Sequence, residues 1–234
     1  MAINKSGGRS CLQSDRRYGE AEVIFQNVLE MRERACGLDD VDALTSVSQL
    51  GSVLALQGKY EEAETMHQQA LQGRLKVLGP EHPDTLTSIS RLGSVLTDQG
   101  KYQEAEAMHQ QALQGYKKVL GPEHPYTLIS VSNLGSVLAQ QGKYNEAEAM
   151  HRQDLAVLEK VLGPKHPDAL TSMHNLAFTL KQRGKVSDAL NLLKKCADLQ
   201  NQVLGSRHPD TISSNNALRA WGTAPSQSSE SRKQ

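Results

Sequence analysis

Two successive segments of 42 residues are almost identical in this chain. Segments 45–86 and 87–128 match at 33 positions and differ at nine, and looser copies continue to about residue 212. A fixed period of this length is the mark of an architecture in which similar units stack on their neighbours. A residue that recurs at this period is therefore one that each repeat needs in order to fold. A specific function must come from residues that break the pattern, or from the surface that the stack creates.

Each repeat reads as two helices joined by a short turn. In segment 83–124, apolar residues stand three or four positions apart, which is the spacing of one helical face. We expect Gly100 to end the first helix in a left-handed conformation and Gly121-Pro122 to end the second. His124-Pro125 then opens the next helix. The sequence thus predicts an all-α protein built from antiparallel helix pairs.

The period also divides the chain into segments. They are an irregular segment at 1–17, a second helix without its first helix at 18–40, complete repeats at 41–82, 83–124, 125–166 and 167–207, a capping helix at 208–221 and a disordered tail at 222–234. The capping helix has polar residues where other first helices have apolar or small ones, as the end of an array requires. Asp154 stands where two other repeats have alanine. We expect this carboxylate to reach solvent or a partner and to weaken the third repeat.

Charge and cysteine content exclude several classes of function. Lysine plus arginine and aspartate plus glutamate both number 26, so the zero net charge argues against a nucleic acid or an anionic membrane as the main partner. The three cysteines share no spacing motif and indicate neither a disulfide framework nor a zinc site. No apolar run approaches the ~18 residues that a membrane helix needs. We therefore expect a cytoplasmic protein without a cofactor or a metal.

The eight histidines are the residues most able to carry chemistry, and the repeat period explains most of them. Four precede proline at the expected start of a first helix, and three lie on the apolar stripe of a second helix, so both sets are interpreted as structural. His174 occurs once, where the other repeats have serine, and is a candidate binding contact. No serine, glycine-rich or carboxylate pattern forms a catalytic constellation. We therefore predict that the chain is not an enzyme.

The second repeat resembles the tetratricopeptide repeat. Leu92-Gly93 and Leu96 on the first helix, with Ala105 and Ala112 on the second, match a signature whose small residues let two helices approach closely. The 42-residue length, the Gly-Lys-Tyr turn and the ending Val-Leu-Gly-Pro-Glu-His-Pro are similar to the kinesin light chain type. Similar arrays occur behind NB-ARC or NACHT nucleotide-binding domains in fungal receptor-like proteins. The resemblance implies a right-handed superhelical solenoid whose first helices line a concave groove.

In that register, the first helices present polar side chains to a bound peptide. The groove-facing candidates are Ser48, Gln49, Ser90, Arg91, Ser132, Asn133, His174, Asn175, Phe178 and Lys181. Kinesin light chains hold the backbone of an extended cargo peptide with paired asparagines in this part of the helix. Here serine takes the first place of the pair in three repeats, and the second place is amide-like in Gln49, Asn133 and Asn175. A solvated face with neutral drift is the alternative interpretation of these positions.

The predicted function is a non-enzymatic scaffold that binds an extended peptide or a partner protein in the concave groove. A second hypothesis is self-assembly, because a second helix without its first helix would expose Phe25, Val28 and Leu29. A third hypothesis is a ligand-sensing repeat module that belongs to a larger receptor-like protein. The first hypothesis rests on the groove candidates, and the other two rest on the incomplete repeat at the start of the chain.

Overall fold

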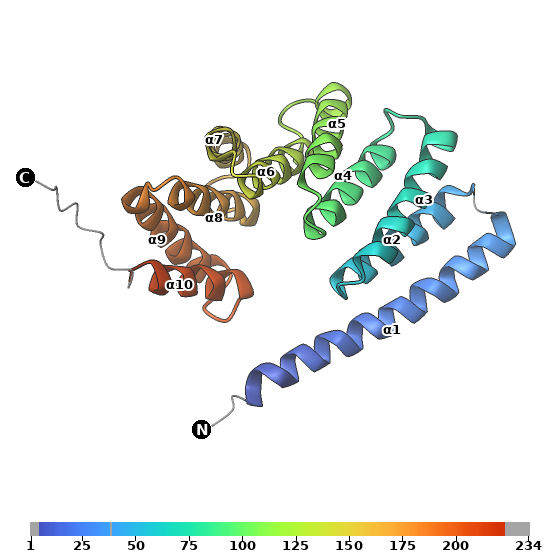
Figure 1. Cartoon of the computed structure of the whole chain (residues 1–234), viewed down its shortest axis with the longest axis horizontal. Helices are drawn as coiled ribbons and strands as arrows, with labels where there is room; N and C mark the ends of the chain where they lie inside the picture. The colour runs from blue at the N-terminus through green and yellow to red at the C-terminus, as the bar shows by residue number, and fades with distance from the viewer. Residues whose placement is uncertain (1–4, 38, 223–234) are drawn as a thin grey trace, which may run out of the picture. The chain divides into compact units, whose positions relative to one another are not determined.

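The computed structural model describes residues 5–37 and 39–222, with side chains from residue 18 onward except at residue 36 (Figure 1). Within these residues every regular element is a helix, so the predicted all-α class is confirmed. The helices are α1 (Lys5–Cys36), α2 (Val41–Leu56), α3 (Tyr60–Leu78), α4 (Pro83–Asp98), α5 (Tyr102–Leu120), α6 (Pro125–Gln140), α7 (Tyr144–Val161), α8 (Pro167–Gln182), α9 (Val186–Val203) and α10 (Pro209–Gly222). We propose to treat α2–α3, α4–α5, α6–α7 and α8–α9 as the first and second helices of the four repeats.

The chain divides into two compact units. The first unit ends at Val137 and the second begins at Leu138, so the division falls inside α6. In the first unit, each of α1 to α4 packs on the helix that follows it. In the second unit, α7 packs on α8, α8 on α9 and α9 on α10. Each unit is therefore a stack in which helices close in sequence are neighbours, as the predicted solenoid of helix pairs requires.

The two helices of a pair meet at alanines on the second helix. Every second helix of the four repeats has one at the same position, and these are Ala63, Ala105, Ala147 and Ala189, each 0% exposed. Ala63 lies in one cluster with Leu50 and Leu54 of its own repeat and with Val95 of the following first helix. Each repeat therefore completes its core with a side chain of the next repeat. Burying one such aliphatic side chain stabilises the fold by about 1.5–3 kcal/mol.

Two second helices have a glycine in their interior, and a leucine side chain of the first helix fills the space beside each glycine. A Cβ atom at Gly73 would lie 2.3 Å from Leu44 Cδ2, and one at Gly115 would lie 2.3 Å from Leu86 Cδ2. Leu44 and Leu86 are only 1% and 2% exposed, so neither can move aside without disturbing the core. The low helix propensity of these glycines is thus offset by a closer approach of the two helices.

The ends of the first helices are fixed by glycine and histidine. Gly58 and Gly100 have a φ of 78°, and the following lysine N–H donates to the carbonyl of Leu54 or Leu96. This pattern satisfies carbonyl groups that a helix end leaves unpaired. At the helix start, His82 Nδ1 accepts from the backbone N–H of Asp84 at 3.2 Å. The histidines before proline therefore act as helix caps.

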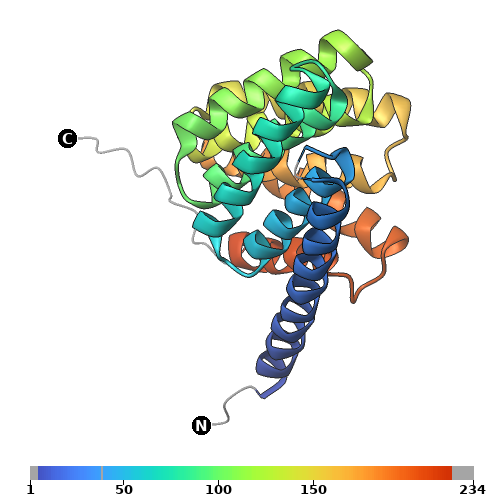
Figure 2. The same ribbon diagram turned by 90° about the vertical axis from the view of Figure 1, so that its right-hand side faces the viewer.

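The start of the chain differs from the expected irregular segment. Residues 5–17 continue α1 as one helix to Cys36, so the expectation for 1–17 is wrong over the described residues. The physical reason is visible at Arg16, which stands where the repeats carry the turn glycine Gly58. Arginine disfavours the left-handed conformation of that turn, so the helix runs on. The first half of α1 consequently projects beyond α2 and α3 (Figure 2).

The end of the chain closes the second unit. Trp221 of α10 is 6% exposed and packs with Leu176, Leu180 and Leu193. This apolar contact joins α10 to both helices of the preceding pair. The expected disordered tail lies, from residue 223 onward, outside the described residues. None of the helices within 5–37 and 39–222 combines the length and the apolarity that crossing a membrane requires.

Asp154 reaches neither solvent nor a partner, which corrects the expectation for this residue. Its side chain is buried at 1% exposure, and both carboxyl oxygens lack a hydrogen-bond partner among the described residues. Burial raises the pKa of Asp154 to about 6, although the nearby Ser172 hydroxyl acts in the opposite direction. The charged form is disfavoured in the fold, so Asp154 destabilises α7 increasingly as the pH rises from about 4 to above 6.

Replacing Gly115 with alanine is expected to destabilise the protein, although alanine is the better helix former by about 1 kcal/mol. The added Cβ would meet Leu86, and overpacking a closed core costs about 1–3 kcal/mol, which outweighs the gain. Urea denaturation of the single variant measures the difference.

The matched control is Gly115→Ala combined with Leu86→Ala, compared with Leu86→Ala alone. Without the leucine methyl groups, the same substitution should stabilise by up to about 1 kcal/mol. A stabilising effect of Gly115→Ala in the parent chain would contradict the packing described above.

Candidate functional site

In the first unit, the groove candidates are joined by one arginine. Arg91 Nη1 on α4 donates to the hydroxyl oxygens of Ser48 at 3.0 Å and Ser52 at 3.2 Å, both on α2. Ser48 is 1% exposed, so it cannot meet a partner as expected from the sequence. Gln49 is exposed, whereas Arg91 is half-buried. Arg91 therefore both links successive first helices and keeps part of its guanidinium at the surface.

The remaining polar candidates lie on the surface or close to it. Ser90 on α4 and Ser132 and Asn133 on α6 are half-buried, and so is Asn175 on α8. An amide that is partly exposed offers both a donor and an acceptor to an incoming peptide bond. The amide side chains of Asn133 and Asn175 are thus partly accessible at the surface.

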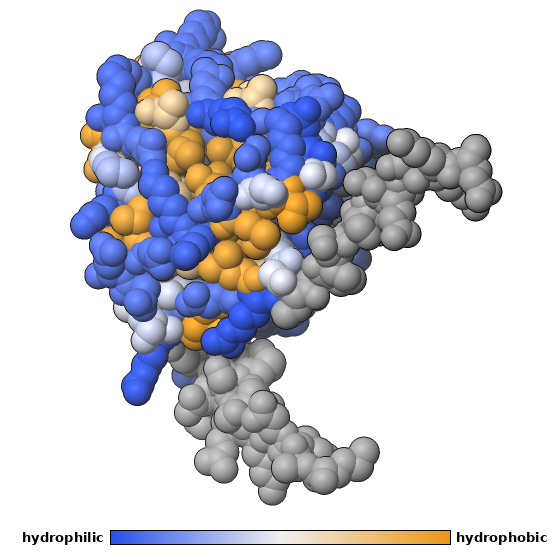
Figure 3. Space-filling model, turned by 90° about the vertical axis from the view of Figure 1, so that its left-hand side faces the viewer, coloured by the Kyte–Doolittle hydropathy of each residue, from blue (hydrophilic) through white to orange (hydrophobic). Residues whose placement is uncertain are grey.

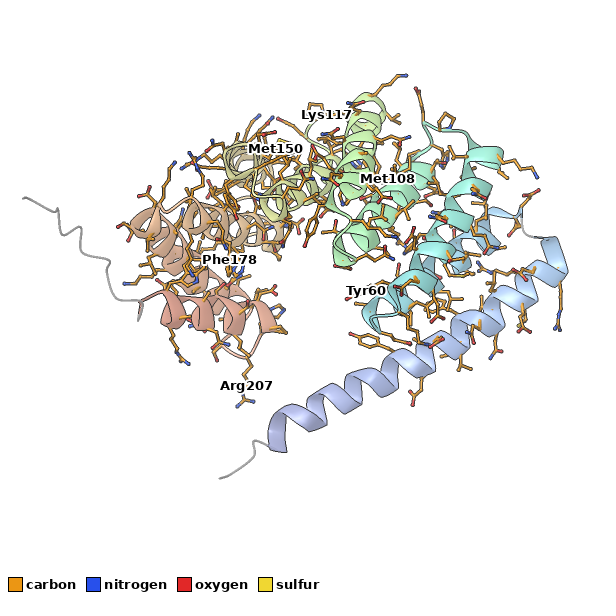
Figure 4. All side chains as sticks on the ribbon, viewed as in Figure 1. Tyr60, Met108, Lys117, Met150, Phe178 and Arg207 are labelled. Atoms are coloured by element: carbon orange, nitrogen blue, oxygen red, sulfur yellow. The ribbon has the colours of Figure 1, made fainter. Side chains whose placement is uncertain are left out.

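In the second unit, three candidates on α8 converge on α10. The ring centroids of His174 and Phe178 are 4.6 Å apart, and Phe178 meets Trp221 edge-on at 4.7 Å. Lys181 Nζ lies 4.5 Å from the centroid of a Trp221 ring, which is a cation–π distance. Phe178 is 37% exposed, and Figure 4 shows it on α8 beside α10. The structure thus brings His174, Phe178 and Lys181 together, in contact with a tryptophan that covers part of them.

The sequence did not link Trp221 to the candidate surface. Its position corresponds, at the 42-residue period, to Val53, Val95, Val137 and Thr179, all of which are buried. Because this position is buried in the earlier repeats, the repeat period could have predicted that the tryptophan packs against α8. His174 Nδ1 contacts Ser214 Oγ of α10 at 2.8 Å. Burial lowers the pKa of His174, and the nearby charge of Asp210 partly offsets this effect, so the imidazole is neutral at pH 7.

The face shown in Figure 3 carries apolar side chains among hydrophilic ones. The exposed large apolar residues of the second unit are Val161, Leu162, Phe178, Val186, Val203 and Ile212. Apolar surface of this kind is available for contact with another protein.

A second periodic interaction was not foreseen. The lysine of the Gly-Lys-Tyr turn binds a glutamate on the preceding second helix, 37 residues earlier. Lys59 Nζ lies 3.0 Å from Glu22 Oε1, and Lys101 Nζ lies 2.9 Å from Glu64 Oε2. The recurrence of both residues at the repeat period was the available signal. These carboxylates are therefore structural contacts between repeats.

In the second unit, this interaction gathers three cations on one carboxylate. Glu148, whose side chain is 7% exposed, accepts from Arg152 Nε at 2.9 Å, from Lys185 Nζ at 3.0 Å and from Arg183. Burial raises the pKa of Glu148, but the hydrogen bonds from these three cations lower it by more, so that it is about 2. The carboxylate is ionised at neutral pH and holds α7 to the turn before α9.

The histidines of the second helices belong to the core. His67, His109 and His151 are each 1% exposed, and burial lowers the pKa of each to about 4. The imidazole of His109 packs where a Cβ on Gly93 would come within 3.0 Å. Within the described residues, no three histidine, cysteine or carboxylate side chains are placed to hold a metal ion.

The sequence matches the tetratricopeptide repeat family in four overlapping segments. They cover residues 10–74, 42–118, 84–160 and 129–202. The chain is similar to crystal structures of a Podosopora anserina protein assigned as a kinesin light chain with nearly identical TPR-like repeats. One of them has 28% identity and a TM-score of 0.66 over 83% of this chain and 95% of the other. A variant of the same protein has 27% identity and a TM-score of 0.68 over 86% and 98%.

Two more distant structures share the fold alone. BtubC (BKLC) from P. vanneervenii has 19% identity and a TM-score of 0.69, with 84% of this chain and 78% of the other covered. The apo form of RapI has 12% identity and a TM-score of 0.63, with 86% and 82% covered. No curated protein sequence shows a significant match to the chain.

Glu148→Gln is expected to lower the free energy of unfolding at pH 7 by about 1–3 kcal/mol, because three cations lose their shared charge partner. The pKa of Glu148 is depressed in the fold, so this stability is present above about pH 4.5 and is lost as the pH falls toward 2. Urea unfolding at several pH values measures it.

Glu64→Gln is the matched control, because Glu64 binds a single lysine and is more exposed. Its effect should be smaller than that of Glu148→Gln at pH 7. Equal effects of the two substitutions would show that the three-cation arrangement adds nothing to stability.

Proposed function

Because the chain belongs to the tetratricopeptide repeat family, whose helical scaffolds are typical of protein–protein interaction, we propose that it is a non-enzymatic, cytoplasmic scaffold for a protein partner. The partner contributes an extended segment that binds along the first helices. The Podosopora anserina relatives support this proposal, because they are assigned as a kinesin light chain and match at 27% and 28% identity.

One observation carries the proposal. The residues at one first-helix position change between the first three repeats, while the residues that build the helix pairs hardly change. This position holds Gln49, Arg91, Asn133 and Asn175 on α2, α4, α6 and α8. Gln49 is exposed, and the other three are half-buried. Side chains of this kind bind peptide groups through several modest hydrogen bonds, each contributing about 0.5–1.5 kcal/mol.

The surroundings of this position in each unit favour different contacts with the partner. In the first unit, Ser48 and Ser52 hold Arg91 in place, so its guanidinium is oriented before a partner arrives. In the second unit, Phe178 offers an apolar contact, and Lys181 is held over Trp221. Pre-oriented side chains lose less conformational entropy on binding than free ones do.

The partner is to be captured with the tagged full chain and identified by mass spectrometry. Asn133→Ala and Asn175→Ala, made singly and together, should then each weaken its binding by about 2–10-fold in calorimetric titrations. The melting temperature should stay nearly unchanged, because both side chains are only half-buried.

Asn201→Ala removes an exposed amide from the second helix α9 and serves as the matched control. It should leave the affinity unchanged. If the double variant Asn133→Ala/Asn175→Ala binds as tightly as the parent chain, the first helices are not the binding surface.

A second candidate function is self-association through α1, favoured by its exposed apolar side chains. They are not Phe25 and Leu29, which pack against the cluster of Leu50 and Leu54. Val28 is half-buried, which also corrects its expected exposure. The exposed residues are Val23, Ile24 and Met31, at 55%, 59% and 71%.

The register explains why this face of α1 is open. Ile24 and Met31 occupy the positions of Met66 and Gly73, which face the first helix of their own repeat. The exposed side of α1 is therefore the side on which the other second helices carry a partner helix. A second copy of the chain could cover it.

Light scattering over a range of concentrations tests this candidate. If α1 mediates association, the mean mass should rise with concentration, and Ile24→Glu combined with Met31→Glu should restore the monomer. A constant monomer mass in the parent chain would exclude self-association, and association that survives the double substitution would exclude α1 as its surface.

A further inference from the structure

The same position of the second helix carries a different residue in each repeat. At the 42-residue period, this position holds Arg74, Tyr116, Leu158 and Gln200. Arg74 is 4% exposed, and its guanidinium joins three elements of the first unit. Its Nη1 donates to the carbonyl oxygen of Asp84 at 3.1 Å and to Ser88 Oγ at 2.9 Å. Its Nη2 donates to Thr45 Oγ1 at 2.9 Å.

Tyr116 fills the same place in the following repeat. It is 2% exposed, and its hydroxyl lies 2.8 Å from Thr87 Oγ1, the counterpart of Thr45. A long side chain with a polar end therefore reaches the threonine of its own first helix in both repeats. The hydroxyl groups of Thr45 and Thr87 therefore both have a hydrogen-bond partner on the second helix of their own repeat.

Gln200 is shorter than either residue, and a cavity of about 70 Å³ lies beside it. The cavity is lined by Thr171, His174, Gln200, Asp210 and Ser213. This volume is large enough to hold more than one water molecule. Thr171 and Asp210 are the counterparts of Thr45 and Asp84. The cavity is thus lined by the counterparts of two of the three residues that receive the guanidinium of Arg74 in the first unit.

The cavity is bordered by a buried hydrogen-bond acceptor that has no donor. Gln200 is 2% exposed, and its Oε1 has no hydrogen-bond partner among the described residues. Thr171 donates to the carbonyl of Pro167 at 3.1 Å. Thr45 likewise donates to the carbonyl of Val41 while it accepts from Arg74. The hydroxyl oxygen of Thr171 can therefore accept a hydrogen bond from a ligand, as the hydroxyl oxygen of Thr45 accepts one from Arg74.

The charges around the cavity favour a cation. Asp210 is the lining residue that carries a negative charge, its side chain is 57% exposed, and neither lysine nor arginine lines the cavity. In the first unit, the backbone carbonyl of its counterpart Asp84 accepts from the guanidinium. His174 is engaged by Ser214, the counterpart of the Ser88 that binds Arg74. A buried acceptor without a donor costs free energy, so a ligand that brings donors gains by filling this space.

We propose that this cavity binds a guanidinium group. The planar fork of N–H donors reproduces what Arg74 supplies in the first unit, whereas an ammonium ion is a compact point charge. The group comes from an arginine side chain of a partner protein or from a small free guanidine compound. The site does not depend on the peptide-binding function proposed above, because a small probe can fill it without any partner.

The test titrates the full chain with methylguanidinium chloride and follows backbone amides by NMR, with sodium chloride at equal ionic strength as the control. Saturable shift changes are expected around Thr171, His174, Gln200 and Asp210 with the probe alone. Gln200→Arg should abolish these changes and raise the melting temperature, because the chain then supplies its own guanidinium as Arg74 does.

Gln200→Leu keeps a residue that the array already carries at this position in Leu158. It removes the buried acceptor and should weaken probe binding by about tenfold. If Gln200→Arg does not fold, the binding measured with Gln200→Leu tests the proposal on its own. Shifts that do not saturate, that sodium chloride reproduces, or that persist in both variants would overturn the proposal. A crystal structure with the probe that shows only ordered water in the cavity would do the same.

Two blocked peptides distinguish the sources of the guanidinium, one with a single arginine and one with lysine in its place. If the arginine peptide competes with the probe and binds more tightly than it, a partner's side chain is the ligand. If the arginine peptide binds no more tightly than methylguanidinium, the natural ligand is a small free guanidine compound. Equal competition by the lysine peptide would contradict recognition of the guanidinium.

Discussion

The structure depends on how closely the two helices of a pair approach each other. Gly73 and Gly115 leave room for Leu44 and Leu86, and fully buried alanines such as Ala63 hold the rest of the contact. Because the core of one repeat includes Val95 of the next, each repeat is finished by its neighbour. Stability is therefore a sum of local contacts along the stack, and a residue outside them is free to change.

Polar contacts fix the order of the repeats on this apolar framework. Lys59, Lys101 and Lys185 each bind a glutamate of the preceding second helix, and Arg91 joins α4 to α2. These contacts are partly exposed and contribute modestly to stability, but they select one register of neighbouring helices. The surface that remains is the one on which a protein partner can act. The residues on that surface can differ between repeats while the residues inside the helix pairs stay almost the same.

Much of the fold followed from the sequence because the period reports backbone requirements directly. Glycine at the turns and histidine before proline at the helix starts both have the roles that local chemistry predicts. Most of the failures have one cause, which is that a period does not show how far a side chain reaches. The sequence did not reveal that Asp154 is buried without a partner, that Trp221 lies against Phe178, or that Gln200 leaves a cavity. The long α1 could have been foreseen, because Arg16 stands at the turn glycine position.

The central claim is that the recurring residues build the scaffold and that the varying residues on the first helices recognise the partner. A mutational scan of the whole chain that scores folding and partner capture separately tests it most directly. The account predicts that substitutions at recurring positions lower folding and capture together. Substitutions at the varying first-helix positions should lower capture alone. The claim is contradicted if the positions that affect only capture lie among the recurring residues, or if none of them lies on the first helices.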